Sequence, residues 1–340
     1  MLQVLCIPSF QTIFLPRSLV RAEQTVRYRC RVGLAIESAA GRCLPPDGRG
    51  GDDRPVTVSE QRNRQEQPVR RNRAGPHPSR IDRMQLPFLY VKIFGERNTG
   101  TNIIAQTIRH NFTVGLLRGE GGALFQLGRL MAPSVPSKER RALRTHLHDI
   151  EMARIRDSDF GWKHSAPPID AIAKAAHRDQ TLFLVITKHP YFWLRSLHRR
   201  PYSFVPPPES ISDFLRTEFP ISRSDELEGD HAPSPVHMFR SKIAAYRRLS
   251  ELPVETLFLR YEDFLTDWDG FMGKMADRLW SRDDAFAPVD ADPKGSAAKL
   301  ADYRKKYDLE KVQEQLSGED RAYVTEILGE ENFAFLGYRP

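Results

Sequence analysis

The chain has 340 residues, 40% of them apolar, which is enough for one large domain or two small ones. Its formal charge of +7 is confined to residues 1–83, which hold fifteen arginines, no lysine and eight acidic residues, so the remainder is formally neutral. All three cysteines, Cys6, Cys30 and Cys43, lie in the same segment, which excludes a disulfide framework and a cysteine metal site from the rest of the chain.

Residues 1–84 are predicted to form a disordered, arginine-rich leader. Residues 48–83 consist largely of Arg, Gln, Pro, Asp and Gly, without apolar periodicity. An arginine-rich start is also typical of organellar transit peptides, and Met84 is a sensible alternative start. Because no apolar stretch approaches the ~20 residues that span a bilayer, we expect a soluble, cytoplasmic protein that does not bind membranes.

The first convincing strand is predicted at residues 88–94, and apolar residues at helical spacing predict a helix over residues 101–112. Between them, Gly95 and Gly100 have the spacing of a G-x-x-x-x-G phosphate loop, whose backbone N–H groups hold anions. Thr101 and Asn102 stand where a nucleotide triphosphatase has Lys and Ser or Thr. The loop therefore predicts an anion site that lacks the groups for magnesium and a γ-phosphate.

The segments that follow alternate between strand and helix patterns. Strands are predicted at residues 160–164, 181–187 and 256–259, and helices at 137–157, 169–176, 191–200, 236–249, 309–316 and 322–328. Such alternation predicts parallel βαβ units. We therefore expect residues 85–340 to form one α/β domain, with three layers and helices on both faces of a mostly parallel sheet, similar to P-loop nucleotide hydrolases.

Ligands of such sheets bind outside the carboxyl ends of the strands, so the loops after the strands carry the candidate site. Lys188 follows the predicted central strand, with Ser196 in the next helix. Lys163 and His164 end the strand predicted at 160–164 and supply a cation and a titratable imidazole. These groups are expected to surround the glycine loop.

The pattern resembles the sulfotransferases that use 3′-phosphoadenylyl sulfate. Their donor loop, P-K-[ST]-G-T-T, is similar to residues 97–102, and their second signature pairs an Arg with a Ser eight positions later, as Lys188 and Ser196 are spaced here. Residues 260–264 and 303–307 also resemble family segments, in the same order along residues 88–338. The resemblance implies that the donor is held by the following residues: Arg97, Asn98, Thr99, Gly100, Thr101, Asn102, Lys188 and Ser196.

The chain departs from the family pattern at the cations. Asn98 replaces the loop lysine, which leaves Arg97 or Lys163 to supply charge, and Lys188 replaces an arginine. The resemblance also implies a general base for the acceptor, and His164 is the first candidate, one residue short of the family spacing from Lys163. Glu96 and Glu120 remain alternatives for the base.

These observations predict an enzyme that transfers a sulfuryl group from 3′-phosphoadenylyl sulfate, as co-substrate and without a metal, to a hydroxyl or amine of a small-molecule or glycan acceptor. Two other functions stay open. One is a P-loop kinase or nucleotide triphosphatase, although the strand at 181–187 does not end in Asp. The other is a non-catalytic nucleotide-binding protein. Nucleic acid is not an expected partner, and the sequence gives no sign of the acceptor's identity or of an oligomeric state.

Overall fold

The computed structural model describes residues 3–5, 13–15, 87–131, 137–201, 208–289 and 300–340. The chain divides into two units, residues 1–78 and 79–340, and each is described by itself. In the first unit, strands β1 (Gln3–Leu5) and β2 (Ile13–Leu15) pair in antiparallel fashion. The predicted disorder of the leader, residues 1–84, otherwise lies outside the described residues.

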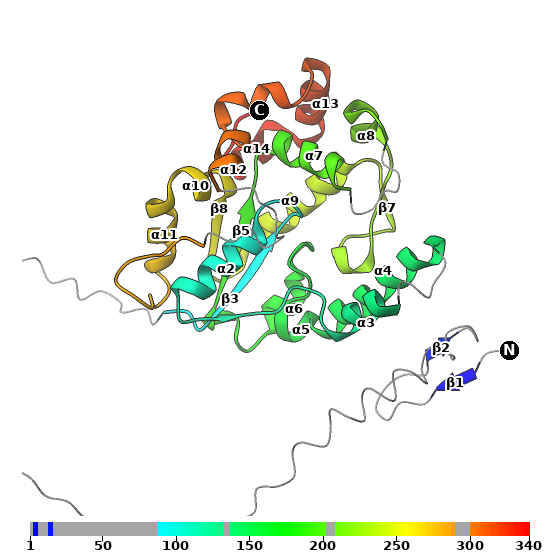
Figure 1. The fold of residues 1–340 in the computed structure, drawn as a ribbon, viewed down its shortest axis with the longest axis horizontal. Coiled ribbons are helices and arrows are strands. Elements are labelled where there is room, and N and C mark those ends of the chain that lie inside the picture. The colour runs from blue at the N-terminus through cyan, green and yellow to red at the C-terminus, as the bar shows by residue number, and fades with distance from the viewer. Residues whose placement is uncertain (1–2, 6–12, 16–86, 132–136, 202–207, 290–299) are drawn as a thin grey trace, which may run out of the picture. The chain divides into compact units, whose positions relative to one another are not determined.

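The second unit is built on a four-stranded parallel sheet with the order β4-β3-β5-β8 (Figure 1). Its strands are β3 (Tyr90–Gly95), β4 (Gly115–Leu116), β5 (Thr181–Thr187) and β8 (Thr256–Arg260). The register places Gly95 opposite Ile186 and Thr187 opposite Arg260. The carboxyl ends of β3, β5 and β8 therefore meet at one edge of the sheet.

The two inner strands are apolar because both of their faces are covered. All seven residues of β5 are buried, as expected of a strand with helices on either side. On one face, Val91 and Leu184 belong to the same core as α2 (Thr101–Asn111). On the other, Phe183 and Val185 pack with α6 (Ile169–Lys174) and α9 (Pro235–Glu251).

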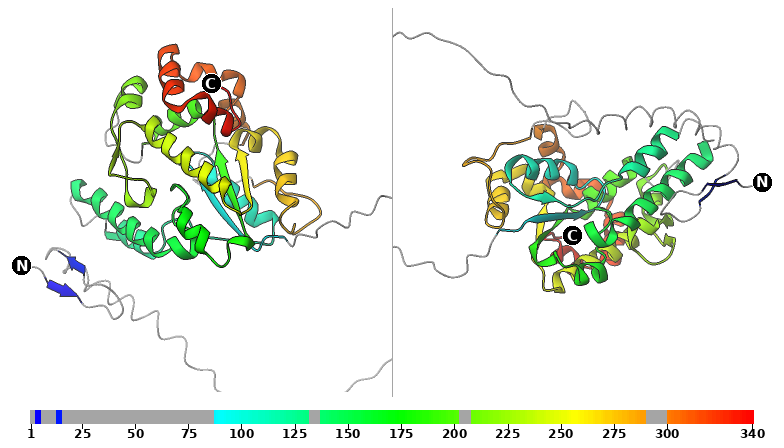
Figure 2. Two further views of the ribbon diagram at one scale, coloured as in Figure 1. Left: turned by 180° about the vertical axis from the view of Figure 1, so that it is seen from behind. Right: turned by 90° about the horizontal axis from the view of Figure 1, so that it is seen from below.

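Two views show this layering directly. Helix α2 lies in front of the sheet in Figure 1, whereas α9 lies in front of it when the unit is seen from behind in Figure 2. The fold within the described ranges is therefore α/β, with helices against both faces of a parallel sheet, as the sequence predicted.

The remaining elements surround this core. The other α-helices are α3 (Ala123–Met131), α4 (Ser137–Arg154), α5 (Arg156–Asp159), α7 (Pro190–Arg199), α8 (Ile211–Arg216), α10 (Tyr261–Thr266), α11 (Trp268–Ala276), α12 (Leu300–Lys306), α13 (Gly318–Leu328) and α14 (Glu330–Phe335). The 3₁₀ helices are η2 (Arg178–Gln180), η3 (Arg223–Asp225) and η4 (Leu309–Gln315), and β6 (Phe219–Pro220) pairs with β7 (His231–Ala232).

The strand predicted at residues 160–164 was wrong. Phe160 and Gly161 have φ angles of 59° and 66°, so two successive residues in the left-handed region turn the chain directly after α5. A chain that reverses in this way cannot extend into a sheet ladder. The segment nevertheless lies beside β3, because the Gly95 N–H donates a hydrogen bond of 2.9 Å to the Lys163 carbonyl.

Candidate functional site

The strand order places a topological switch point between β3 and β5. The chain steps from β3 to β4 on one side and then to β5 on the other side of β3. In doubly wound sheets the ligand crevice lies outside the carboxyl ends of the strands at such a point. The loop after β3, residues 95–100, and the loop after β5, residues 188–190, both leave this edge. The geometry of the sheet thus brings the two predicted anion-binding loops together.

The loop after β3 is a tight turn that leads directly into α2. Asn98 and Gly100 have φ angles of 67° and 80°, and the Thr99 hydroxyl donates a hydrogen bond of 2.6 Å to the Glu96 carbonyl. Gly100 caps α2 without a side-chain hydrogen bond. The first N–H groups of the helix therefore remain open to an anion, with the positive end of the helix dipole behind them.

Gly100 is required by both its conformation and its neighbour. A Cβ at this position would lie 2.2 Å from the Tyr261 ring, and its φ is one that L-residues adopt at a cost. We expect Gly100→Ala to lower the free energy of unfolding by about 2 kcal/mol, measured by urea denaturation. The matched control is Gly273→Ala in α11, where a Cβ meets nothing within 4 Å. A helical Gly→Ala change should instead stabilise by about 0.5–1 kcal/mol, so equal effects would contradict this reading.

The loop after β5 is joined to the loop after β3 by Lys188. Its Nζ donates to the Asn98 carbonyl at 2.9 Å and to Ser196 Oγ at 3.1 Å, so the predicted pair eight residues apart is indeed in contact. The side chain is fully buried, and in the described part of the chain no carboxylate lies within 4.0 Å of its ammonium. Burial lowers the pKa of Lys188. A buried cation without a carboxylate partner is well placed to receive an anionic ligand.

Tyr307, which the sequence reading named only as part of a similar segment, completes the surroundings of Lys188. The ammonium lies 3.8 Å from the centroid of the Tyr307 ring and 5.5 Å from that of Tyr261. Burial raises the pKa of the Tyr307 phenol, but the charges of Lys188 and Lys306 outweigh it and lower the pKa to about 8. Two aromatic rings therefore lie against a cation that, among the described residues, has no carboxylate within 4.0 Å.

Lys163 and Arg97 were the two candidates to replace the positive charge of the loop lysine, and their side chains contact different groups. The Lys163 ammonium donates to Asn102 Oδ1 in the first turn of α2 and to Glu120 Oε1. The Arg97 guanidinium instead lies over the Trp162 ring, 4.6 Å from its centroid. Lys163 is thus the cation that reaches the amino end of the helix.

His164, the candidate base, is fixed by the glycine loop. Its Nδ1 lies 2.6 Å from the Gly95 carbonyl, so Nδ1 carries the proton and Nε2 has the lone pair. Burial, together with the charges of Lys163 and Arg97, lowers its pKa well below 6.5. The imidazole is therefore neutral at pH 7 and able to accept a proton at Nε2.

The two carboxylates kept as alternative bases differ in position. Glu96 is buried beneath the loop, where Lys242 and Tyr246 contact its oxygens at 3.4 and 3.3 Å. The Glu120 side chain is 64% exposed and pairs with Lys163. Glu96 thus belongs to the support of the loop, whereas Glu120 lies at its open side.

Other side chains of the two loops are buried or form hydrogen bonds within the protein. The Thr99 hydroxyl is engaged by Glu96, and Thr101 is buried. His189 accepts from the Tyr191 N–H at 3.3 Å through Nδ1 and contacts the Arg339 carbonyl at 2.9 Å through Nε2. The His189 N–H in turn donates to Glu262 Oε1 at 3.1 Å. Ligand contacts in this region are therefore left to backbone N–H groups, to the lysines and to Ser196.

Sequence reasoning missed Lys242, although a signal was present. It stands four residues after Met238 and four before Tyr246, on the stripe of α9 that holds these two buried residues. A lysine on a core-facing stripe indicates a buried polar partner. The structure supplies Glu96, Asp225 and the His164 carbonyl.

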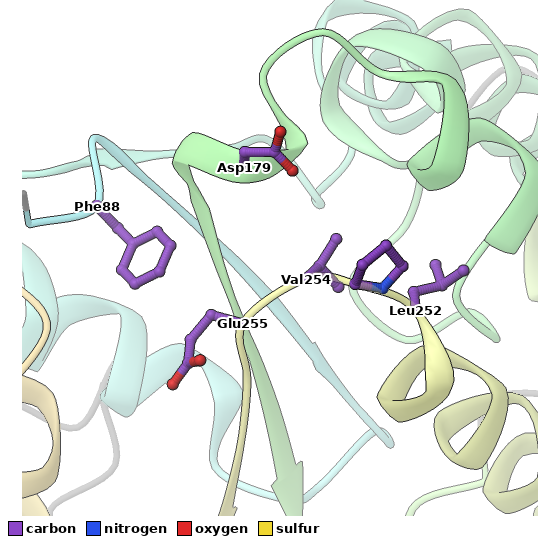
Figure 3. Close-up of a pocket in the computed structure, with 6 residues that line it drawn as sticks. Phe88, Asp179, Leu252, Val254 and Glu255 are labelled. Carbon is purple, nitrogen blue, oxygen red and sulfur yellow. The ribbon is translucent and has the colours of Figure 1, made fainter. Parts of the chain in front are cut away.

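A hollow at the other end of the sheet does not belong to this site. Figure 3 shows that it is lined by Phe88, Asp179, Leu252, Pro253, Val254 and Glu255. Asp179 precedes β5 and Glu255 precedes β8, so the hollow lies at the amino ends of these strands. Glu255 is also paired with Arg278 at 2.7 Å.

No family model matches this chain, and a search of curated proteins finds no similar one. Among the described residues, no helix combines the length and the apolar character needed to cross a membrane. Within the same ranges, no group of three or more His, Cys, Asp or Glu side chains is arranged to hold a metal ion.

Proposed function

We propose that the chain is a sulfotransferase with a P-loop-like donor site for 3′-phosphoadenylyl sulfate, acting on a hydroxyl or amine of a small-molecule or glycan acceptor. One observation carries this proposal: Lys188 bridges the Asn98 carbonyl and Ser196 Oγ while it has no carboxylate partner among the described residues. A ligand with two separated phosphates would match this cation and the open N–H groups of α2.

The donor, when bound, would supply the sulfuryl group. Lys188 and Ser196 would hold its 3′-phosphate, and the N–H groups at the start of α2 with Lys163 would face the 5′-phosphate. Backbone amides and one cation can balance the charge that develops on the leaving phosphate oxygen, without magnesium. His164 Nε2 would accept the proton of the acceptor as its oxygen or nitrogen attacks sulfur and the bond from sulfur to the phosphate oxygen breaks.

A magnesium-dependent kinase or triphosphatase fits these residues less well. Thr101 and Asn102 leave the loop without the lysine and hydroxyl that hold a γ-phosphate and magnesium. Strand β5 ends at Thr187, which is followed by Lys188 rather than by an acidic metal ligand. Lys163 is the one cation that replaces part of this apparatus, and it is already engaged by Asn102 and Glu120.

The test is calorimetric titration with adenosine 3′,5′-bisphosphate. We expect the wild type to bind it without magnesium, and Lys188→Ala to bind at least tenfold more weakly, because a charge-assisted hydrogen bond is lost. Lys274→Ala, at an exposed position in α11, is the control and should bind as the wild type does. Absence of binding, or binding of ATP only with magnesium, would overturn the proposal. Binding without sulfuryl transfer would favour a non-catalytic nucleotide-binding protein.

A further inference from the structure

Lys242 is a fully buried lysine whose ammonium joins three loops at the candidate site. Its Nζ lies 2.6 Å from the His164 carbonyl, 3.0 Å from Asp225 Oδ1 and 3.4 Å from Glu96 Oε2. These partners come from the turn after α5, from η3 and from the loop after β3. No other described lysine has side-chain or backbone partners in both the glycine loop and the segment of the candidate base.

The partners of Lys242 are themselves held in place. Tyr246, one turn further along α9, donates to Glu96 Oε1 at 3.3 Å. Asp225 Oδ2 accepts from the Ser222 N–H and hydroxyl, both at 2.9 Å, and its carbonyl accepts from the Ala166 N–H at 2.8 Å. The ammonium is thus the centre of a satisfied polar network, and such networks rigidify the groups they connect.

The charges in this network are arranged around one cation. Burial raises the pKa of Glu96. Burial acts in the same direction on Asp225, but the Lys242 charge and the Ser222 hydrogen bonds outweigh it and hold the pKa of Asp225 below its usual range. The arrangement is therefore one ammonium between two buried carboxyl groups, and burial raises the pKa of one of them, Glu96.

We propose that Lys242 is a positioning residue for both the glycine loop and His164. It acts on the loop through Glu96 and on the imidazole through the backbone carbonyl of His164. The inference rests on the proposed function, since it supports the same donor loop and base. Lys242 acts through Glu96 and the His164 carbonyl, so its effect on a ligand is indirect.

The pKa of His164 is the readout that distinguishes this role from a purely structural one. Burial lowers this pKa most, and the charges of Lys163, Arg97 and, least, Lys242 add to it, from its own turn, from the glycine loop and from α9. Removing the Lys242 charge should therefore raise the pKa of His164 toward 6.5. The measurement is an NMR titration of the histidine side chains, with His164→Gln to assign the resonance.

Two variants distinguish a positioning role of Lys242 from a role in folding alone. Lys242→Met leaves the buried Asp225 without its cation, whereas Lys242→Met combined with Asp225→Asn removes both charges and keeps the volume. We expect folded Lys242→Met to show the raised pKa; in the double variant the two lost charges oppose each other at the imidazole. The double variant should bind adenosine 3′,5′-bisphosphate about tenfold more weakly, and Lys242→Arg should keep part of the affinity. An unchanged pKa together with unchanged affinity would overturn the proposal, as would a double variant that does not fold, since Lys242 would then be a structural residue.

Lys92→Met is the matched control, because Lys92 in β3 is also fully buried and its ammonium donates to three backbone carbonyls. It should lower stability without raising the pKa of His164. The NMR titration needs no ligand. If the wild type fails to bind the bisphosphate, the proposed function is lost while the titration still decides whether Lys242 positions His164.

Discussion

Replacing Lys92 with methionine is expected to lower the free energy of unfolding by about 3 kcal/mol. The Lys92 ammonium is fully buried in β3 and donates to the carbonyls of Arg118, Asp159 and Gly161 at 2.7, 2.5 and 2.6 Å. Methionine fills a similar volume but leaves these three carbonyls without the donor, at about 1 kcal/mol for each lost hydrogen bond. Urea denaturation followed by circular dichroism measures the change.

The surface variant Lys274→Met should stay within about 0.5 kcal/mol of the wild type, because it removes no buried contact. An unchanged urea midpoint in Lys92→Met, with an unchanged slope, would show that the three carbonyl contacts do not stabilise the fold. The side chain of Lys92 also explains how the irregular segment before Trp162 is held against the sheet.

The lowered pKa of Lys92 determines how the free energy of unfolding changes with pH. Burial lowers the pKa of Lys92 from 10.5 to about 7, so between these values the folded state binds fewer protons than the unfolded state. Stability then rises with pH across this window. The difference in unfolding free energy between the wild type and Lys92→Met should accordingly grow from pH 7 toward pH 10.

The second large effect is expected at Lys163. Lys163→Met should weaken binding of adenosine 3′,5′-bisphosphate by about 10- to 100-fold, because the cation at the amino end of α2 is lost. Arg97→Met should change the affinity less than threefold, since the Arg97 guanidinium lies over Trp162 rather than at the helix end. Isothermal calorimetry of the two variants decides which cation replaces the lysine that Asn98 does not provide.

Glu120→Gln is expected to change the affinity for the bisphosphate in the opposite direction from Lys163→Met. The Glu120 carboxylate is largely exposed and contacts Lys163, so it competes with an anionic ligand for the same ammonium. Removing its charge should strengthen bisphosphate binding. If Arg97→Met has the larger effect, or if Glu120→Gln weakens binding, the assignment of Lys163 is wrong.

Much of the fold could be predicted because a few segments carry unambiguous patterns. The run at residues 181–187 is continuous and β-branched, and it is β5 with the same bounds. The Lys188 and Ser196 pair was expected from the resemblance to the sulfotransferase signature, and the short stretch from the loop after β5 into α7 brings the two side chains into contact. Local rules of this kind need no knowledge of the tertiary contacts.

What could not be predicted depends on backbone angles and distant partners. Residues 160–164 read as a strand with the aromatic residues Phe160 and Trp162 two positions apart, yet positive φ angles at Phe160 and Gly161 turn the chain. Lys92 and Lys242 are lysines inside apolar patterns, and their partners lie 26 or more and 17 or more residues away in sequence, respectively. Burial of such cations becomes visible only when those partners are in place.

The hydrogen bonds of Gly95 have a consequence for the order of events in a catalytic cycle. Its N–H is bonded to the Lys163 carbonyl, and its carbonyl is bonded to His164 Nδ1. These two hydrogen bonds therefore link the position of the glycine loop to that of the imidazole. Under the proposed function, any adjustment of the loop to the first substrate would be transmitted to the proton acceptor before the second substrate arrives. This coupling would make binding of the nucleotide and of the acceptor interdependent.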